Sequence, residues 1–160
     1  MMRVVVLGIG NTLMSDEGFG VHALEALLSR YDLPEDVEAV DGGTTGMELL
    51  ADLQGVTHLL VLDAVRAGQP EGEMVRLVGD DVPAFFKTKL SPHQIGLSDV
   101  LAALAFMGSP VEQVVVVGVK PVSLELGMEL TPAVAAKIDP AIAMILDELT
   151  ALGHPAKAKA

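Results

Sequence analysis

The first twenty residues, MMRVVVLGIGNTLMSDEGFG, constrain the fold more than any other stretch of the chain. Residues 3–7 are predicted to form a strand buried on both faces, as in the centre of a parallel sheet, because Val4 to Leu7 carry consecutive β-branched and apolar side chains. A glycine-rich loop follows, and then apolar residues at helical spacing predict a helix from about Phe19 to Arg30. Loops of this kind commonly bind phosphate. This one carries Asp16 and Glu17, whose carboxylates repel phosphate, so a different ligand is expected.

The rest of the chain alternates strands and helices. Apolar runs predict buried strands over His58 to Leu62 and Gln113 to Val117, and a short strand is expected over Val37 to Val40. Glu73 to Val78 follows a turn too short for a helical crossover, so we expect an antiparallel strand near an edge. This pattern predicts a three-layer α/β/α sandwich with a mostly parallel five-stranded sheet and one antiparallel edge strand, in a single domain over residues 1–152. Residues 153–160 are expected to form a flexible tail.

Several further helix starts can be placed. Ser91-Pro92-His93-Gln94 has the form of a capping box with proline at the first helical position, and this helix is expected to continue to Gly108. Two C-terminal helices are expected to begin at Thr131-Pro132 and at Asp139-Pro140. A short helix is expected around Leu50 and Leu53, and residues 80–89 are expected to be irregular with one turn around Phe85.

Composition excludes several classes of function. The net charge is −12, and nucleic acids or anionic membrane surfaces require clustered Lys and Arg instead. No apolar run reaches the length of a membrane span, so a cytoplasmic protein without membrane insertion is expected. The chain has no cysteine, which excludes disulfides, thiol nucleophiles and thiolate metal sites. Any metal must therefore be held by oxygen or by imidazole nitrogen.

Four candidate site residues follow predicted strands or begin a helix: Glu17, Asp41, Asp63 and His93. In an open parallel sheet, ligands bind beyond the carboxyl ends of the strands, where the strand order reverses. If the first three strands lie in the order 2-1-3, the first and third are neighbours about 4.8 Å apart. The carboxylates of Glu17 and Asp63 would then converge. The order 3-2-1-4, typical of nicotinamide-binding folds, would separate them.

Two converging carboxylates need a proton or a cation between them. With His93 they form a two-oxygen, one-nitrogen set that suits a divalent transition metal with open coordination positions. Each residue also has a structural interpretation. Glu17 could complement the start of the next helix, Asp63 could bind loop amides, Asp41 could form an Asx turn, and His93 could face solvent. Asp16 is expected to be the cap of that helix, and it is left out of the site.

Two other classes of function remain as alternatives. Gly8-Ile9-Gly10-Asn11-Thr12-Leu13 begins like a dinucleotide-binding fingerprint, but Leu13 stands where the third glycine is required. Asp41 resembles the ribose-binding acid of such enzymes, so a nucleotide-binding oxidoreductase is a weak alternative. A non-catalytic carrier or sensor of a divalent metal could use the same acid, acid and histidine set.

Six segments, taken in series, resemble the hydrogenase maturation endopeptidases. They extend over nearly the whole chain: residues 8–13 (GIGNTL), 16–20 (DEGFG), 41–44 (DGGT), 62–64 (LDA), 93–97 (HQIGL) and 118–121 (GVKP). Each segment alone is weak, but six in order are specific. The resemblance implies an α/β/α fold and an endopeptidase that removes the C-terminal extension of a [NiFe] hydrogenase large-subunit precursor after nickel insertion.

The resemblance also implies roles for single residues. The nickel-recognising residues of the family match Glu17, Asp63 and His93 here. The acid of its D-G-G-T motif matches Asp41, which is the expected catalytic residue, either as general base or as support for the site. Nickel is expected to arrive on the substrate, so the enzyme itself would be isolated without metal. The alternative is a non-catalytic nickel carrier or sensor that uses the same three residues. The expected partner is the large-subunit precursor, and the enzyme is expected to be a monomer.

Overall fold

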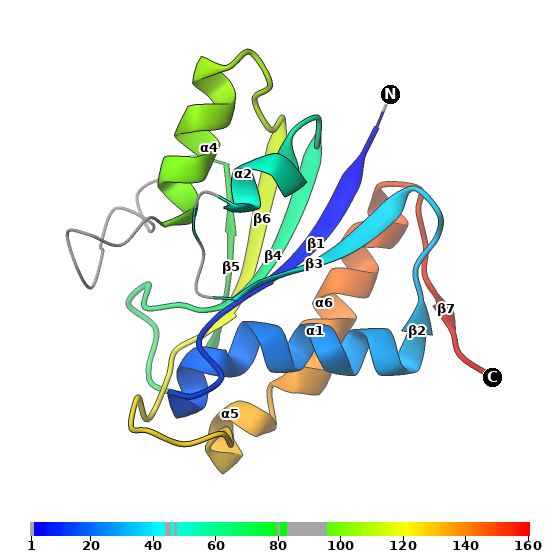
Figure 1. The fold of residues 1–160 in the computed structure, drawn as a ribbon. Coiled ribbons are helices and arrows are strands. Elements are labelled where there is room, and N and C mark those ends of the chain that lie inside the picture. Colours follow the sequence, from blue (N-terminus) through cyan, green and yellow to red (C-terminus); the bar gives the residue numbers. More distant parts are fainter. Residues whose placement is uncertain (1, 44–45, 47, 80, 83–95) are drawn as a thin grey trace.

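The computed structural model of the chain describes residues 2–43, 46, 48–79, 81–82 and 96–160 (Figure 1). Strands and helices alternate along it, as the sequence predicts. The elements are β1 (Val4–Ile9), η1 (Ser15–Gly18), α1 (Phe19–Arg30), β2 (Tyr31–Asp32), β3 (Val37–Gly43), α2 (Glu48–Leu53), β4 (His58–Ala64), β5 (Met74–Val78), α4 (Leu97–Phe106), β6 (Gln113–Val119), α5 (Pro132–Ala135), α6 (Ile138–Ala151) and β7 (Lys157–Ala158).

The main sheet has five strands in the order β3-β1-β4-β6-β5. Four of them are parallel, and β5 pairs antiparallel with β6 at one edge, which confirms the predicted sheet. β1, β3 and β4 are the first three apolar strands of the prediction, and they lie in the order 2-1-3. Gly8 pairs with Asp41 on one side and with Leu62 on the other, so these strands end at the same edge of the sheet.

Helices cover both faces of the sheet, which confirms the three-layer arrangement (Figure 1). Alternate residues of β1 point to opposite faces because side chains alternate along a strand. Val4 and Val6 pack with α1 and α6, whereas Val5 and Leu7 pack with α2 and α4. All four are fully buried, and burying each such side chain contributes about 1.5–3 kcal/mol.

The helix that precedes β6 begins later than predicted. α4 starts at Leu97, and Gly96 before it has extended backbone angles, so a helix running unbroken from Ser91 to Gly108 is wrong. The Asp99 carboxylate accepts a hydrogen bond of 3.0 Å from the Gly96 N–H, which fixes this start. The predicted cap at residues 91–94 lies outside the described residues, as does the predicted turn around Phe85.

The C-terminal elements differ from the prediction in two places. α5 begins at Pro132 as expected, but α6 begins at Ile138, so Asp139 lies in its first turn and pairs with Arg30 at 2.5 Å. Residues 153–160 were expected to form a flexible tail. Instead β7 pairs antiparallel with β2, and the Lys159 N–H donates to the Arg30 carbonyl. A pairing two residues long leaves no periodic pattern in the sequence.

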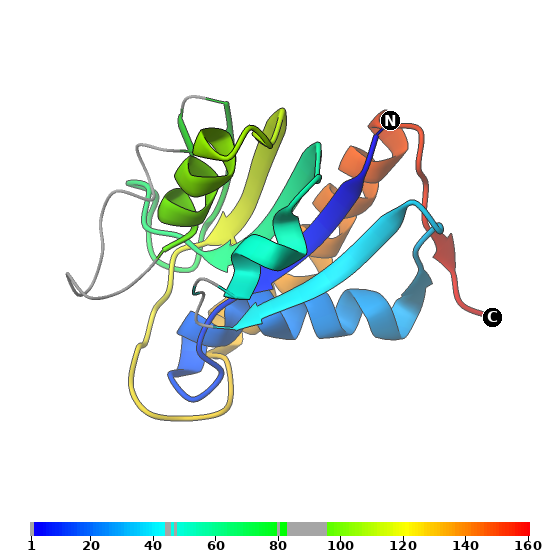
Figure 2. The same cartoon turned by 45° about the horizontal axis from the view of Figure 1, so that its top comes forward.

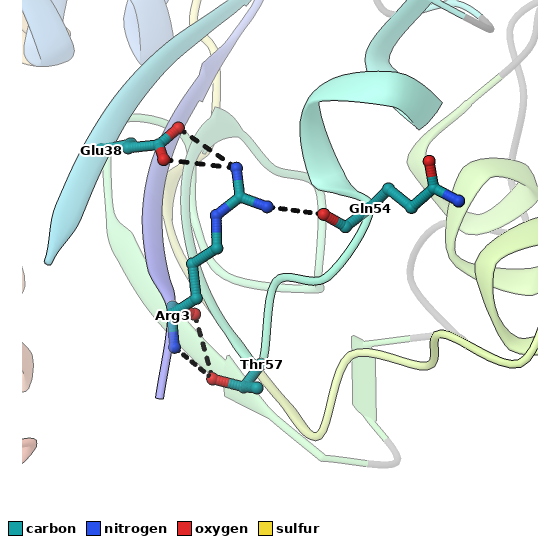
Figure 3. Close-up of polar contacts among 4 residues, drawn as sticks. All are labelled: Arg3, Glu38, Gln54 and Thr57. Atoms are coloured by element: carbon teal, nitrogen blue, oxygen red, sulfur yellow. Dashed lines mark hydrogen bonds and ion pairs between the residues drawn. The ribbon is translucent and has the colours of Figure 1, made fainter. Parts of the chain in front are cut away.

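Arg3 joins three elements at the start of the sheet (Figure 3). Its main-chain N–H donates to the Thr57 hydroxyl at 2.9 Å, and that hydroxyl donates to the Arg3 carbonyl at 3.0 Å. The guanidinium reaches Glu38 on β3 at 3.3 Å and the Gln54 carbonyl at the end of α2. These contacts stabilise the edge opposite to the one where the candidate acids lie.

Over the described part of the chain, no helix is long and apolar enough to cross a membrane.

Candidate active site

Glu17 and Asp63 lie at the carboxyl ends of neighbouring strands. Glu17 belongs to η1, which follows β1, and Asp63 is the penultimate residue of β4. Gly20 brings these elements together because a Cβ there would lie 2.1 Å from the Leu62 carbonyl oxygen and 2.2 Å from that of Ile9. Only glycine allows the first turn of α1 to approach both strands this closely.

Gly10 has a matching role in the loop before η1. Its φ of +149° is rarely adopted by residues with side chains, and a Cβ would lie 2.0 Å from the Glu17 carbonyl oxygen. The loop therefore folds back against the backbone of Glu17. The glycines of this loop allow the backbone to pack closely around Glu17, whose carboxylate would repel a phosphate group.

The two acids share an environment that disfavours their charges. Burial raises the pKa of the Asp63 carboxyl well above its ordinary value, the nearby Glu17 raises it further, and a hydrogen bond from the Ala64 N–H partly offsets these effects. Burial also raises the pKa of Glu17, and the positive charge of Arg66 partly offsets that rise. Asp63 is 7% exposed. The Glu17–Asp63 pair would therefore be stabilised by a proton or a cation between the carboxylates.

His93, the third predicted ligand, lies outside the described residues. Among the residues that the structure does describe, no group of three or more His, Cys, Asp or Glu side chains is arranged to hold a metal ion. The described half of the candidate site is thus a pair of carboxylates. Carboxylate oxygens can bind a cation, accept a proton from water or donate a proton to a leaving group.

Asp41 ends up at the same edge of the sheet, but in a different setting. It lies on β3 beside Gly8, is exposed, and accepts a hydrogen bond of 2.8 Å from the Gly43 N–H. This is the Asx-turn contact that the sequence left open as its structural interpretation. Over the described residues, Asp41 forms no hydrogen bond or ion pair with Glu17 or Asp63.

Asp16 has a role that the sequence did not reveal. It was expected to cap α1, but η1 and α1 have no side-chain cap, and Asp16 is fully buried. Its carboxylate accepts hydrogen bonds from the N–H groups of Val122, Ser123 and Thr131 and from the Thr131 hydroxyl, at 2.8–3.1 Å. Asp16 therefore binds the segment between β6 and α5, while the charge of Glu17 beside it acts on Asp63. No local signal could have predicted contacts more than 100 residues away.

Backbone contacts join the same two loops. The Ser15 N–H donates to the Gly127 carbonyl at 2.8 Å, the Gly127 N–H donates to the Leu13 carbonyl at 3.0 Å, and the Ser15 hydroxyl donates to the Glu125 carbonyl at 2.6 Å. Ser15 has a φ of +50°, which is unfavourable for a residue with a side chain. These bonds hold that conformation one residue before Asp16 and two before Glu17.

Arg66 is a second residue that the sequence did not single out. It follows Asp63 by three positions, in the loop after β4, and its side chain is exposed. Its charge favours the ionised form of Glu17. The sequence did contain a signal for Arg66, because this basic residue lies three positions after the candidate acid Asp63 in a chain that has 10 Lys and Arg against 22 Asp and Glu.

Comparison with known proteins adds an independent line of support. Residues 21–148 match a family model described as hydrogenase maturation protease. The chain is 48% identical over 153 residues to the hydrogenase 2 maturation protease of Escherichia coli K12, covering 95% of this chain and 93% of that protein. It is 46% identical to the hydrogenase expression/formation protein HupD of Rhodobacter capsulatus, covering 94% of this chain and 73% of that protein.

Solved structures agree with these sequence matches. The structure of the hydrogenase maturating endopeptidase HybD from E. coli superposes with a TM-score of 0.93 at 47% identity, covering 99% of this chain and 98% of that one. A [NiFe] hydrogenase maturation protease HybD from Thermococcus kodakarensis superposes with a TM-score of 0.72 at 26% identity, covering 92% and 99%. The similarity thus extends over the whole sandwich, including the edge that carries Glu17 and Asp63.

Proposed function

Because the chain belongs to the hydrogenase maturation protease family, we propose that it removes the C-terminal extension of a [NiFe] hydrogenase large-subunit precursor once nickel has been inserted. The proposal has a second part. Nickel held by the precursor is the feature that the enzyme recognises, and the nickel belongs to the substrate and not to the enzyme.

The observation that carries the proposal is the Glu17–Asp63 pair. Burial and mutual repulsion raise the pKa of the Asp63 carboxyl, with burial the larger cause. A divalent ion that approaches the pair would attract both carboxylates and offset the repulsion between them. A substrate that lacks the ion would lose this attraction and bind more weakly. Such a pair can therefore distinguish a metal-loaded precursor from a metal-free one.

Discrimination of this kind is a difference between two binding free energies. A precursor without nickel would leave two partly buried carboxylates without a counter-charge. A precursor with nickel would supply that charge and fix its own C-terminal segment across the edge of the sheet. His93 is the third proposed ligand, on the strength of the resemblance, and its imidazole nitrogen would complete a set suited to nickel.

The reaction itself is hydrolysis of one peptide bond. A water molecule adds to the scissile carbonyl, and the proton it loses is transferred to the departing amine. Holding the scissile bond in place lowers the activation barrier by about 7–11 kcal/mol in well-oriented systems. The substrate's nickel would polarise the carbonyl or lower the pKa of the attacking water. Asp41 is our candidate for the base that accepts the proton, since its carboxylate is exposed at the same edge of the sheet.

The alternatives from the sequence lose support. The first strand of the main sheet, β1, lies between the second and the third, which are β3 and β4. In the 3-2-1-4 order of the nicotinamide-binding folds, the first strand lies between the second and the fourth. A carrier or sensor without catalysis is less consistent with relatives that are named maturation protease and endopeptidase.

The proposal is tested by incubating the purified protein with large-subunit precursor from the same organism, loaded with nickel or free of it. We expect the loaded precursor to lose the mass of its extension and the nickel-free precursor to stay intact. Equal cleavage of both forms would overturn recognition through nickel. Binding of the loaded precursor without cleavage of either form would favour a carrier.

A further inference from the structure

Exposed apolar side chains are concentrated on the two loops that Asp16 joins. Among the described residues, eight large apolar side chains are exposed, and four of them lie on these loops. They are Leu13 (58% exposed), Val122 (42%), Leu126 (85%) and Met128 (70%). Figure 2 shows the two loops side by side, below the carboxyl ends of the strands. We call these four side chains the loop patch.

The loop patch is held by specific contacts. Residues 14 and 127 form a parallel bridge, so Leu13 lies on one loop beside Leu126 and Met128, which flank Gly127 on the other. Val122 donates its N–H to the buried Asp16 carboxylate at 2.9 Å. A surface held in this way is organised before it binds, and binding to it does not require the loops to be ordered.

The loop patch also adjoins the candidate active site. Leu13 lies four residues before Glu17, and the Glu17 N–H donates a hydrogen bond of 3.1 Å to the carbonyl of Met14, the residue after Leu13. Asp16, the residue directly before Glu17, accepts a hydrogen bond of 2.8 Å from the N–H of Thr131, at the end of the second loop. A polypeptide that reaches the Glu17–Asp63 pair can therefore pass over the loop patch.

The charges around the loop patch indicate the chemistry of its partner. Glu125 and Glu129 are exposed on the same loop, within one residue of Leu126 and Met128, and the whole chain has a net charge of −12. Apolar side chains inside an acidic rim match an apolar segment flanked by Lys or Arg.

We propose that the loop patch is the docking surface for such a segment of the large-subunit precursor, outside the bond that is cut. This inference rests on the proposed function, since it names how the same substrate is bound. The loop patch contributes to the binding affinity for the precursor, whereas the Glu17–Asp63 pair recognises its metal ion. Phe106 offers a matched control because it is 93% exposed, equally apolar, and lies at the end of α4 near the opposite edge of the sheet (Figure 1).

The test uses the full chain and the nickel-loaded precursor, with cleavage followed by mass and binding followed by interferometry. For Leu126→Ser combined with Met128→Ser, we expect KM and Kd to rise about 10-fold, with kcat unchanged, because exposed anchors act on binding alone. Glu125→Lys combined with Glu129→Lys should also raise KM, and should reduce its dependence on salt. Phe106→Ser should leave all three constants unchanged, and the melting temperatures of all variants should match that of the wild type.

The outcomes separate the two proposals. Unchanged KM and Kd in the Leu126 and Met128 variant, or an equal loss in Phe106→Ser, would overturn the docking surface. If the wild type does not cleave the loaded precursor but binds it more tightly than the variant does, the proposed function fails and the docking surface stands. A wild type that neither binds nor cleaves the precursor would overturn both.

Discussion

The Asp16 carboxylate accepts hydrogen bonds from both the main-chain N–H and the hydroxyl of Thr131, at 2.8 Å and 2.9 Å, across 115 positions of sequence. Thr131 precedes α5 but donates its hydroxyl to Asp16 and does not cap that helix with it. One buried acid thus holds the entire segment between β6 and α5 against the loop that carries Glu17. The position of Glu17 depends on this contact as well as on the glycines around it.

Replacing Asp16 should cost considerable stability. In Asp16→Asn one oxygen becomes an amide that cannot accept the hydrogen bonds of Val122 and Ser123. Leaving such buried donors unpaired should lower the free energy of unfolding by about 2–4 kcal/mol. Urea denaturation measures this change. Asp52→Asn, which alters an exposed aspartate on α2, should leave the midpoint almost unchanged.

The contribution of Asp16 should also depend on pH with a defined sign. Burial alone would raise the pKa of this carboxyl, but the hydrogen bonds from Ser123, Thr131 and Val122 together hold it below the ordinary value of 3.8. A group whose pKa is lower in the folded state adds stability above its unfolded pKa and loses it as the pH falls through the folded one. The difference in stability between wild type and Asp16→Asn should therefore be full at neutral pH and shrink only in strong acid. A difference that grows on acidification would contradict the contacts described.

Asp63 should behave in the opposite way. Burial and the neighbouring Glu17 raise the pKa of Asp63, so its contribution to stability is complete below 3.8 and is lost as the pH rises through the higher folded value. Asp63→Asn should therefore stabilise the metal-free protein at neutral pH by roughly 0.5–2 kcal/mol and have little effect in acid. The same substitution should abolish processing of nickel-loaded precursor. Thermal unfolding at two pH values measures the first effect, and a destabilised variant at neutral pH would contradict the account.

Gly20 should not tolerate a side chain. In Gly20→Ala the new methyl group would meet the carbonyl oxygens of Leu62 and Ile9 at about 2 Å, which forces α1 away from β1 and β4. We expect a loss of about 3 kcal/mol or more in stability, with Glu17 displaced from Asp63. Gly96→Ala is the control because a Cβ there meets nothing within 4 Å. Equal unfolding midpoints for the two variants would show that the close approach is not required.

The C-terminal strand should stabilise the fold without taking part in the reaction. Removing residues 155–160 deletes β7, its pairing with β2 and the contact of Lys159 with the Arg30 carbonyl. The loss should be about 1 kcal/mol, since the strand is short and exposed. Processing of precursor should proceed at the wild-type rate. A truncated protein that unfolds at the wild-type temperature would show that the pairing adds nothing.

Local patterns predict much of this fold. The buried strands, the first helix and the antiparallel edge strand follow from apolar periodicity, because the periods of strand and helix differ and each is visible over a few residues. The convergence of Glu17 and Asp63 follows from the strand order, since parallel strands end at one edge of the sheet. These are consequences of local sequence and of a small number of possible topologies.

Features that depend on distant contacts could not be predicted. Asp16 binds amides more than 100 residues away, and in sequence it looks like any acid before a helix. β7 pairs two residues with two others, which gives no periodic signal. The start of α4 was misplaced because Ser91-Pro92-His93-Gln94 has the composition of a cap, whereas the extended backbone of Gly96 and its bond to Asp99 set the observed start.

Metal recognition by Glu17 is tested most directly by mixing Glu17→Gln with nickel-loaded precursor and scoring the electrophoretic shift of cleavage. The amide retains the shape of the side chain but removes the charge that would meet the metal. Glu25→Gln, which alters an exposed glutamate on α1, is the matched control. We expect no shift with Glu17→Gln and a normal shift with Glu25→Gln. Normal processing by Glu17→Gln would contradict the account.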